Sequence, residues 1–113
     1  MSQANQTKKA IIAASVYLEL RGFTILERNY RRPNCEIDII ASRDSVVYFV
    51  EVRNQNDYED TNSVSLALVT KHRQTVWGAH IWLEESKWLG KHVLAAVELS
   101  GPDCSVMGFI ENT

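Results

Sequence analysis

Two apolar runs separated by a short polar segment form the clearest pattern in the chain. The segments "EIDIIAS" (residues 36–42) and "VVYFVEVRN" (residues 46–54) are rich in β-branched and aromatic side chains, which predicts two strands. The polar "RDS" between them predicts that they form a hairpin. The second run is apolar at every position from Val46 to Val50, so we expect it in the middle of a sheet covered on both faces.

Helical spacing appears in two places. Residues 8–21 carry Ile12, Val16 and Leu20 at intervals of four, and Gly22 follows at a C-cap position, so we expect a helix that buries these three side chains. A longer helix is predicted from about residue 64 to residue 85, with Ser63 as its N-cap. Its expected apolar stripe consists of Leu68, His72, Val76, Ala79 and Leu83.

Three more strands complete the predicted architecture. They are "FTILERNY" (23–30), "HVLAAVEL" (92–99) and the edge strand "CSVMGFIE" (104–111). Turns are expected at "RRPNC" and "SGPD", and a loop at the polar residues 55–63. The order αβββαββ predicts an α/β fold in which a mixed sheet of about five strands is flanked by two main helices. With 113 residues, the chain is expected to form one domain, residues 1–113.

Charge and cysteine content narrow the class of protein. The formal charge of −2 excludes the global positive field of a strongly basic nucleic-acid binder, so contact with phosphates would need a local patch. Cys35 and Cys104 have no metal-ligand spacing and are expected to be free thiols in a reducing cytosol. The apolar run after Lys8 and Lys9 is too short to span a bilayer. We therefore expect a cytoplasmic protein without a membrane partner, and a homodimer would help so small a core.

Three carboxylates interrupt the predicted hairpin. If the loop is centred on residues 43 and 44, Ala41 pairs with Val46, Asp38 with Phe49, and Glu36 with Glu51. Opposed residues share a face of the sheet, and so do alternate residues along each strand. Side chains that project from the same face would then be Glu36, Asp38, Glu51 and Arg53. A loop of three residues would move one of the two sets to the opposite face.

Acids inside apolar strands are costly unless a positive charge compensates them. Mg²⁺ or Mn²⁺ is one solution, with Asp38, Glu51 and the backbone carbonyl of Val52 as oxygen ligands. Such an ion activates water for hydrolysis, and Arg53 would then engage a phosphate. The alternative is structural, because the acids can instead pair with the arginines at positions 28, 31 and 32.

Two groups of basic residues flank the predicted site. One group is Arg28, Arg31 and Arg32, and the other is Lys71, His72 and Arg73. A charge run is usually a solvated surface, but two runs on either side of a cation site favour a nucleic-acid groove. Candidate phosphate contacts are therefore Arg28, Arg31, Arg32, Lys71 and Arg73.

The segments "YLELRGFTILERNYR", "CEIDII", "VYFVEVRNQ" and "TKHRQTVWGAHIWL" strongly resemble the YraN family of small bacterial proteins. The resemblance extends from about residue 10 to residue 97. It implies a restriction-endonuclease-like fold and a metal-dependent nuclease of the PD-(D/E)xK type. It also implies that Asp38 and Glu51 are metal ligands, that Arg53 takes the place of the motif's basic residue, and that Glu36 is the acid two residues before the aspartate.

The chain departs from the family pattern at three positions. Cys35 replaces a glycine, and cysteine accepts a positive φ far less easily. Ile11 stands near the position of a helix glutamate, and Arg53 replaces a lysine and cannot act as a base. These departures weaken the case for cleavage more than the case for binding. Two hypotheses follow: a Mg²⁺-dependent endonuclease that acts on DNA, including branched DNA, and a non-catalytic nucleic-acid-binding or scaffold module on the same fold.

Overall fold

The computed structural model describes residues 3–54 and 61–112, and its elements follow the predicted order αβββαββ. They are α1 (Gln3–Leu20), β1 (Thr24–Arg32), β2 (Cys35–Arg43), β3 (Val46–Asn54), α2 (Thr61–Ser86), β4 (Lys91–Ser100) and β5 (Ser105–Asn112).

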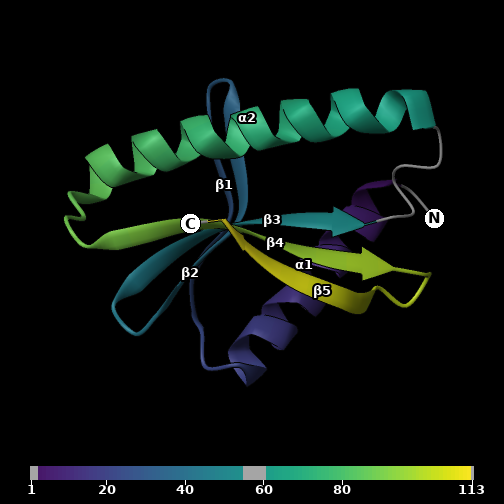
Figure 1. Ribbon diagram of the computed structural model, residues 1–113, viewed down its shortest axis with the longest axis horizontal. Coiled ribbons are helices and arrows are strands. Elements are labelled where there is room, and N and C mark those ends of the chain that lie inside the picture. Colours follow the sequence, from purple (N-terminus) through teal and green to yellow (C-terminus); the bar gives the residue numbers. More distant parts are fainter. Residues whose placement is uncertain (1–2, 55–60, 113) are drawn as a thin grey trace.

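The five strands form one mixed sheet in the order β1-β2-β3-β4-β5, which places β3 at the centre and β5 at an edge. Neighbouring strands are antiparallel except β3 and β4, which are parallel. A parallel pair needs a long crossover, and α2 provides it. The two helices cover opposite faces of the sheet (Figure 1). The predicted α/β class, strand number and edge strand are confirmed.

Each face of the sheet has its own hydrophobic core. Val50 of β3 packs in the core beneath α1, whereas its neighbour Phe49 packs in the core beneath α2. This alternation explains the unbroken apolar run of β3, because both sides of the strand are covered. The prediction of a central strand is confirmed.

The predicted buried face of α1 is wrong. Ile12, Val16 and Leu20 are 52%, 50% and 83% exposed. The helix instead packs against the sheet through the face that carries Ala10, Ile11, Ala14, Ser15 and Leu18. Three of these side chains are small, so the helix backbone can approach the strands closely. Spacing alone does not distinguish this stripe from the one that carries the larger apolar residues.

The end of α1 agrees with the prediction. Gly22 has a φ of 89°, and its N–H bonds to the carbonyl of Glu19. The N–H of Phe23 bonds to the carbonyl of Leu18, which completes a Schellman motif. Phe23 then enters the core beneath α1.

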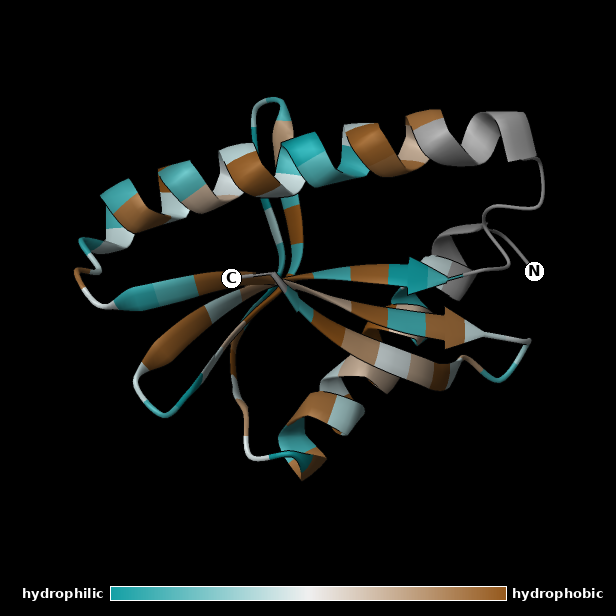
Figure 2. Cartoon of the chain, in the orientation of Figure 1, coloured by the Kyte–Doolittle hydropathy of each residue, from teal (hydrophilic) through white to brown (hydrophobic). Residues whose placement is uncertain are grey.

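The second helix is longer than predicted. It begins at Thr61, so Ser63 lies within it and is not its N-cap, while residues 55–60 of the predicted loop lie outside the described part of the chain. Hydrophobic and hydrophilic residues alternate along α2 (Figure 2), as in a helix with one buried face. Gly78 faces β2, and a Cβ there would lie 2.8 Å from Cγ1 of Ile37. The missing side chain lets α2 pack tightly on the sheet.

The β2–β3 hairpin has a different register from the predicted one. Asp44 and Ser45 form a two-residue loop in which both φ values are positive, 52° and 64°, as in a type I′ turn. The turn centre is therefore one residue later than predicted, and Phe49 pairs with Ile40 rather than with Asp38. The pairing shifts by two residues, and an even shift leaves the paired residues from Ile39 to Arg43 on their predicted faces. Beyond them the alternation of β2 breaks at Asp38, because Ile37 packs beneath α2 and Ile39 packs beneath α1.

Neither helix has a stretch long and apolar enough to cross a membrane within the residues that the structure describes. Cys35 and Cys104 are free thiols, as predicted, and both are buried.

Candidate functional site

The candidate site lies where the ladder between β2 and β3 ends. The last pair of this ladder is Ile39 with Val50. Two residues further along β3, the N–H of Val52 donates to Oδ2 of Asp38 at 2.7 Å. The carbonyl of Val52 accepts a bond from Nζ of Lys71 at 2.5 Å. The side chains of Asp38 and Lys71 thus bind the N–H and the carbonyl of Val52, the two backbone groups that would otherwise continue the ladder.

Asp38 and Lys71 form an ion pair with Nζ 2.9 Å from Oδ2. The side chain of Asp38 is 6% exposed and that of Lys71 is 28% exposed. Lys71 reaches the pair from α2, which covers this face of the sheet (Figure 1). We call Asp38, Val52 and Lys71 the Asp38 cluster. Nζ of Lys71 thus contacts oxygen atoms of Asp38 and Val52, which are two of the three residues predicted to bind Mg²⁺.

Glu51 has different partners. Its Oε1 lies 2.7 Å from Nδ1 of His72, and its Oε2 lies 3.4 Å from Nε of Arg53. A carboxylate only accepts hydrogen bonds, so Nδ1 carries the proton when Glu51 is ionised. We call Glu51, His72 and Arg53 the Glu51 cluster. The charge of Asp38 is thus compensated by Lys71 of α2, and that of Glu51 by Arg53 of β3. These pairs offset the cost of placing acids in apolar strands.

The two clusters adjoin each other. Val52 follows Glu51 in β3, and His72 follows Lys71 in α2. Consecutive helix residues point about 100° apart, so Lys71 and His72 reach different carboxylates of the same sheet region. The predicted set of Asp38, Glu51 and Arg53 therefore gathers beneath one segment of α2, but in two adjoining groups.

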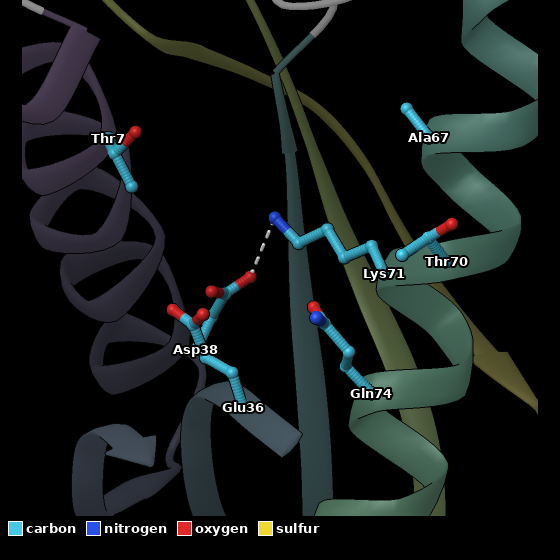
Figure 3. Close-up of a pocket in the computed structure, with 7 residues that line it drawn as sticks. All are labelled: Thr7, Glu36, Asp38, Ala67, Thr70, Lys71 and Gln74. Atoms are coloured by element: carbon cyan, nitrogen blue, oxygen red, sulfur yellow. Dashed lines mark ion pairs between the residues drawn. The ribbon is translucent and has the colours of Figure 1, made fainter. Parts of the chain in front are cut away.

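A cleft of about 440 Å³ opens beside the Asp38 cluster. Figure 3 shows Lys71 extending from α2 toward Asp38, with Thr7 of α1 on the far side. The cleft is lined by Thr7, Glu36, Asp38, Ala67, Thr70, Lys71 and Gln74. A volume of this size is within the range of small-molecule sites, so one sugar-phosphate unit has room to enter.

A smaller cavity of about 40 Å³ adjoins the same residues. Its lining includes Asp38, Val52 and Lys71, together with Ile11 and Asn54. About 10–15 Å³ is enough for one water molecule, so an ion with attached water has room beside Asp38. No group of three or more His, Cys, Asp and Glu side chains is arranged to hold a metal in the described ranges. A cation here would therefore depend on backbone oxygen and water as well as on carboxylates.

These donors fit a hard divalent cation. The Asp38 carboxylate and the Val52 carbonyl already converge on one positively charged nitrogen. Mg²⁺ prefers oxygen ligands and keeps several waters, so it needs few protein ligands.

The three positions that depart from the family pattern have clear locations. Ile11 is 3% exposed and lines the small cavity beside Asp38, so α1 contributes no acid there. Cys35 does not have a positive φ, because Asn34 takes the left-handed conformation of this turn with a φ of 63°. The replacement of glycine by Cys35 therefore causes no backbone strain. Arg53 lies against Glu51 and is not among the residues that line the cleft.

The three arginines of β1 do not form one cluster. Arg28 donates to Oγ of Ser15 in α1 at 2.9 Å, whereas Arg32 bonds to Glu85 of α2 at 3.1 Å. These helices lie on opposite faces of the sheet. Arg31 lies 3.5 Å from Glu36, so the structural pairing of acids with these arginines holds for Glu36 but not for Asp38 or Glu51.

Arg32 belongs to a contact that ties the β1–β2 hairpin to α2. The hydroxyl of buried Tyr30 donates to Oε1 of Glu85, and the guanidinium of Arg32 stacks on the Tyr30 ring at 4.3 Å. The bond from Tyr30, and then that from Arg32, lowers the pKa of Glu85. Burial is the first cause that raises the pKa of Tyr30. Arg32 is thus engaged in holding the fold together.

Sequence reasoning missed the partners of the two buried acids. Lys71 was expected to contact phosphate, and His72 was expected on the buried stripe of the helix. Neither expectation pairs these residues with Asp38 and Glu51, because strand and helix meet only through the tertiary fold. The cleft residues Thr7, Thr70 and Gln74 gave no local signal at all.

Comparison with known proteins places the chain among bacterial relatives. The family model described as "Uncharacterised protein family UPF0102" matches residues 12–99. A UPF0102 protein of Sulfurovum sp. is 34% identical over 101 residues, which covers 88% of this chain and 84% of that protein. A UPF0102 protein of Desulforapulum autotrophicum is 37% identical over 73 residues, or 65% of this chain.

Other relatives match over a shorter part of their length. The matched segment spans 60% of the Desulforapulum protein. In a UPF0102 protein of Chloroherpeton thalassium, 32% identical over 79 residues, it spans 61%. The names of these relatives give a family and no activity.

Proposed function

The chain belongs to the UPF0102 family, the YraN family that its motifs resemble, and we propose that it is a metal-dependent nuclease-like protein that binds DNA. Its core would be of the restriction-endonuclease-like type, and its reaction would be the hydrolysis of phosphodiester bonds. The observation that carries this proposal is the convergence of the Asp38 carboxylate and the Val52 carbonyl on one cationic atom beside an open cleft.

The proposed ligands of the cation are Asp38, the carbonyl of Val52 and Glu51. A bound Mg²⁺ or Mn²⁺ would supply an activated water and would screen the charge of a phosphate. Asp38 is fixed for this role, because the N–H of Val52 holds its carboxylate in place. Glu36 lines the same cleft and would orient water near the reacting phosphate.

Arg53 has the role of a cationic support. Its guanidinium lies 3.4 Å from Glu51 and its side chain is 27% exposed, so it would have to extend from Glu51 toward the cleft to contact an entering phosphate. Arginine binds phosphate oxygens through two parallel N–H groups. Because it remains protonated, Arg53 would stabilise negative charge and would not remove a proton from water.

The proposed contacts with the DNA backbone are exposed arginines that neighbour cleft residues in contact or in sequence. Arg31 has a side chain that is 69% exposed, despite its ion pair with Glu36. Arg73 is exposed on α2, two residues after Lys71. With a net charge of −2, the protein would bind DNA through such local contacts, and salt would weaken the binding strongly.

The second candidate is a nucleic-acid-binding module without cleavage. Two observations favour it: the acids of both clusters already have basic partners within the chain, and Ile11 stands where an additional acid would complete the site. In this case Asp38 would serve the fold by binding the N–H of Val52.

Cleavage of defined DNA substrates separates the two candidates. Branched, nicked and linear DNA would each be incubated with the protein in Mg²⁺ or Mn²⁺, beside the variants Asp38→Ala and Asp38→Asn. Asp44→Asn is the matched control, because it removes an exposed acid from the turn that follows β2. Circular dichroism would establish that each variant is folded.

The nuclease proposal expects cleavage that needs the divalent cation, that both Asp38 variants abolish, and that Asp44→Asn retains. Salt-sensitive binding without cleavage would support the module instead. If the protein neither binds nor cuts any of these substrates, both candidates are wrong.

A further inference from the structure

We propose that Lys71 is a built-in occupant of the cation position, and that a divalent cation binds only by displacing its ammonium group. This inference rests on the proposed cation site and adds a residue that regulates access to it. Its basis is that Nζ of Lys71 contacts Oδ2 of Asp38 and the carbonyl oxygen of Val52 at the same time.

A divalent cation and the ammonium group cannot share these oxygens. Nζ lies 2.9 Å from Oδ2 and 2.5 Å from the carbonyl oxygen, whereas Mg²⁺ needs oxygens at about 2.0–2.1 Å around the same point. Two positive groups so close would also repel each other strongly in a partly buried site. Binding of the ion therefore requires that Lys71 leaves.

The cleft beside Lys71 has room for its ammonium group in a second position. The side chain of Lys71 is 28% exposed, compared with 6% for Asp38. Lys71 also lines the cleft of about 440 Å³, next to Thr70 and Gln74 of its own helix. A lysine side chain has several rotatable bonds, so its ammonium group can swing from Asp38 into this space while the backbone of α2 stays in place.

The exchange keeps the buried acid compensated at every stage. Without the ion, Lys71 balances the charge of Asp38 and binds the carbonyl of Val52. With the ion, the same two oxygens become its ligands, and the ammonium group enters the cleft where a phosphate would lie. Loading of the cation would thus also deliver a positive group to the substrate, and the two events would be coupled.

The affinity for Mn²⁺ tests this exchange without any enzymatic readout. The free Mn²⁺ would be measured by electron paramagnetic resonance in titrations of the wild-type protein, Lys71→Met and Lys71→Gln. The glutamine variant removes the charge but keeps a donor for the carbonyl of Val52. Lys91→Met is the matched control, because Lys91 is exposed and pairs with Val46 at the opposite end of β3.

Loss of the competing ammonium group should tighten Mn²⁺ binding by about tenfold or more in both Lys71 variants, because the site is then vacant in every molecule. Mn²⁺ should also raise the melting temperature of these variants by more than that of the wild type. Lys91→Met should match the wild type. Adding Asp38→Asn to Lys71→Met should remove the gain.

Equal or weaker Mn²⁺ affinity in the Lys71 variants would overturn the inference. The cleavage assay separates this failure from that of the proposed function. Cleavage that depends on Asp38, with no gain in Mn²⁺ affinity, contradicts the exchange alone. A gain in affinity without DNA binding or cleavage supports the exchange and contradicts the nuclease.

Discussion

Nζ of Lys71 lies 2.9 Å from Oδ2 of Asp38, and the same nitrogen contacts the carbonyl of Val52. Three elements meet at this atom, since Asp38 comes from β2, Val52 from β3 and Lys71 from α2. The contact therefore closes the open end of the β2–β3 ladder and ties the helix to it. Stability and the proposed chemistry depend on the same carboxylate.

Asp38→Asn should lower the free energy of unfolding by roughly 1–3 kcal/mol. The amide still accepts the bond from the N–H of Val52, but the ammonium group of Lys71 loses the charge that balances it. Unfolding in urea would measure the difference. Asp44→Asn, in the exposed turn, should stay within about 0.5 kcal/mol of the wild type. Equal unfolding midpoints for Asp38→Asn and the wild type would mean that the pair contributes nothing.

Glu85 should make part of the stability sensitive to acid. Its pKa is lowered in the folded protein, first by the bond from Tyr30 and then by the bond from Arg32. A lowered pKa means that Glu85 contributes stability above its ordinary value of about 4.3, and that this contribution is lost as the pH falls through the folded value.

Urea unfolding of Glu85→Gln and the wild type, repeated at successive pH values, measures this effect. The wild type should be more stable at neutral pH, and the gap should shrink once the pH falls below about 4.3. A gap that stays constant down to the lowest pH would show that the carboxylate charge is not what Tyr30 and Arg32 stabilise.

Ser45→Gly should stabilise the protein by up to about 1 kcal/mol. Ser45 has a φ of 64° in the two-residue turn between β2 and β3, a conformation that glycine adopts without strain. Ser45→Val should destabilise it, because β-branched residues disfavour a positive φ. Thermal unfolding of the two variants gives the comparison, and an equal effect of both would contradict the turn geometry.

Loss of the charge at Arg73 should affect DNA binding, whereas loss of the charge at Arg32 should affect stability. Arg73→Gln should weaken DNA binding for all sequences and lower the salt dependence by about one ion. Arg32→Gln should mainly lower stability, because Arg32 holds Glu85 and the Tyr30 ring. Binding titrations over a range of salt, with urea unfolding of both variants, would test this. If Arg32→Gln is fully folded and loses more DNA affinity than Arg73→Gln, the roles of the two arginines are the reverse of those predicted.

The strands could be predicted because their signals are local. The apolar run from Val46 to Val50 indicated a central strand, and Gly22 indicated the end of α1. The register failed by two residues because the positive φ values at Asp44 and Ser45 are not evident from residue types that also fit other turns. The shift is even, so Glu51 kept its predicted face, whereas at Asp38 the alternation of β2 breaks between Ile37 and Ile39.

The buried face of α1 and the partners of the acids were beyond local reasoning. The large apolar side chains of Ile12 and Val16 predicted that their face of α1 is buried. The helix instead packs closely against the sheet through the face with Ala10 and Ala14. The contact between Asp38 and Lys71 joins residues on separate elements. Asp38 and Lys71 meet only because α2 crosses over the sheet, so no local sequence pattern predicts this ion pair.

A crystal soaked in Mn²⁺ tests the proposed cation site most directly, through anomalous scattering that identifies the metal. We predict a peak at bonding distance from the Asp38 carboxylate and the Val52 carbonyl, with the ammonium group of Lys71 moved into the cleft. Lys71 still bound to Asp38, with no peak beside them at saturating Mn²⁺, would contradict it.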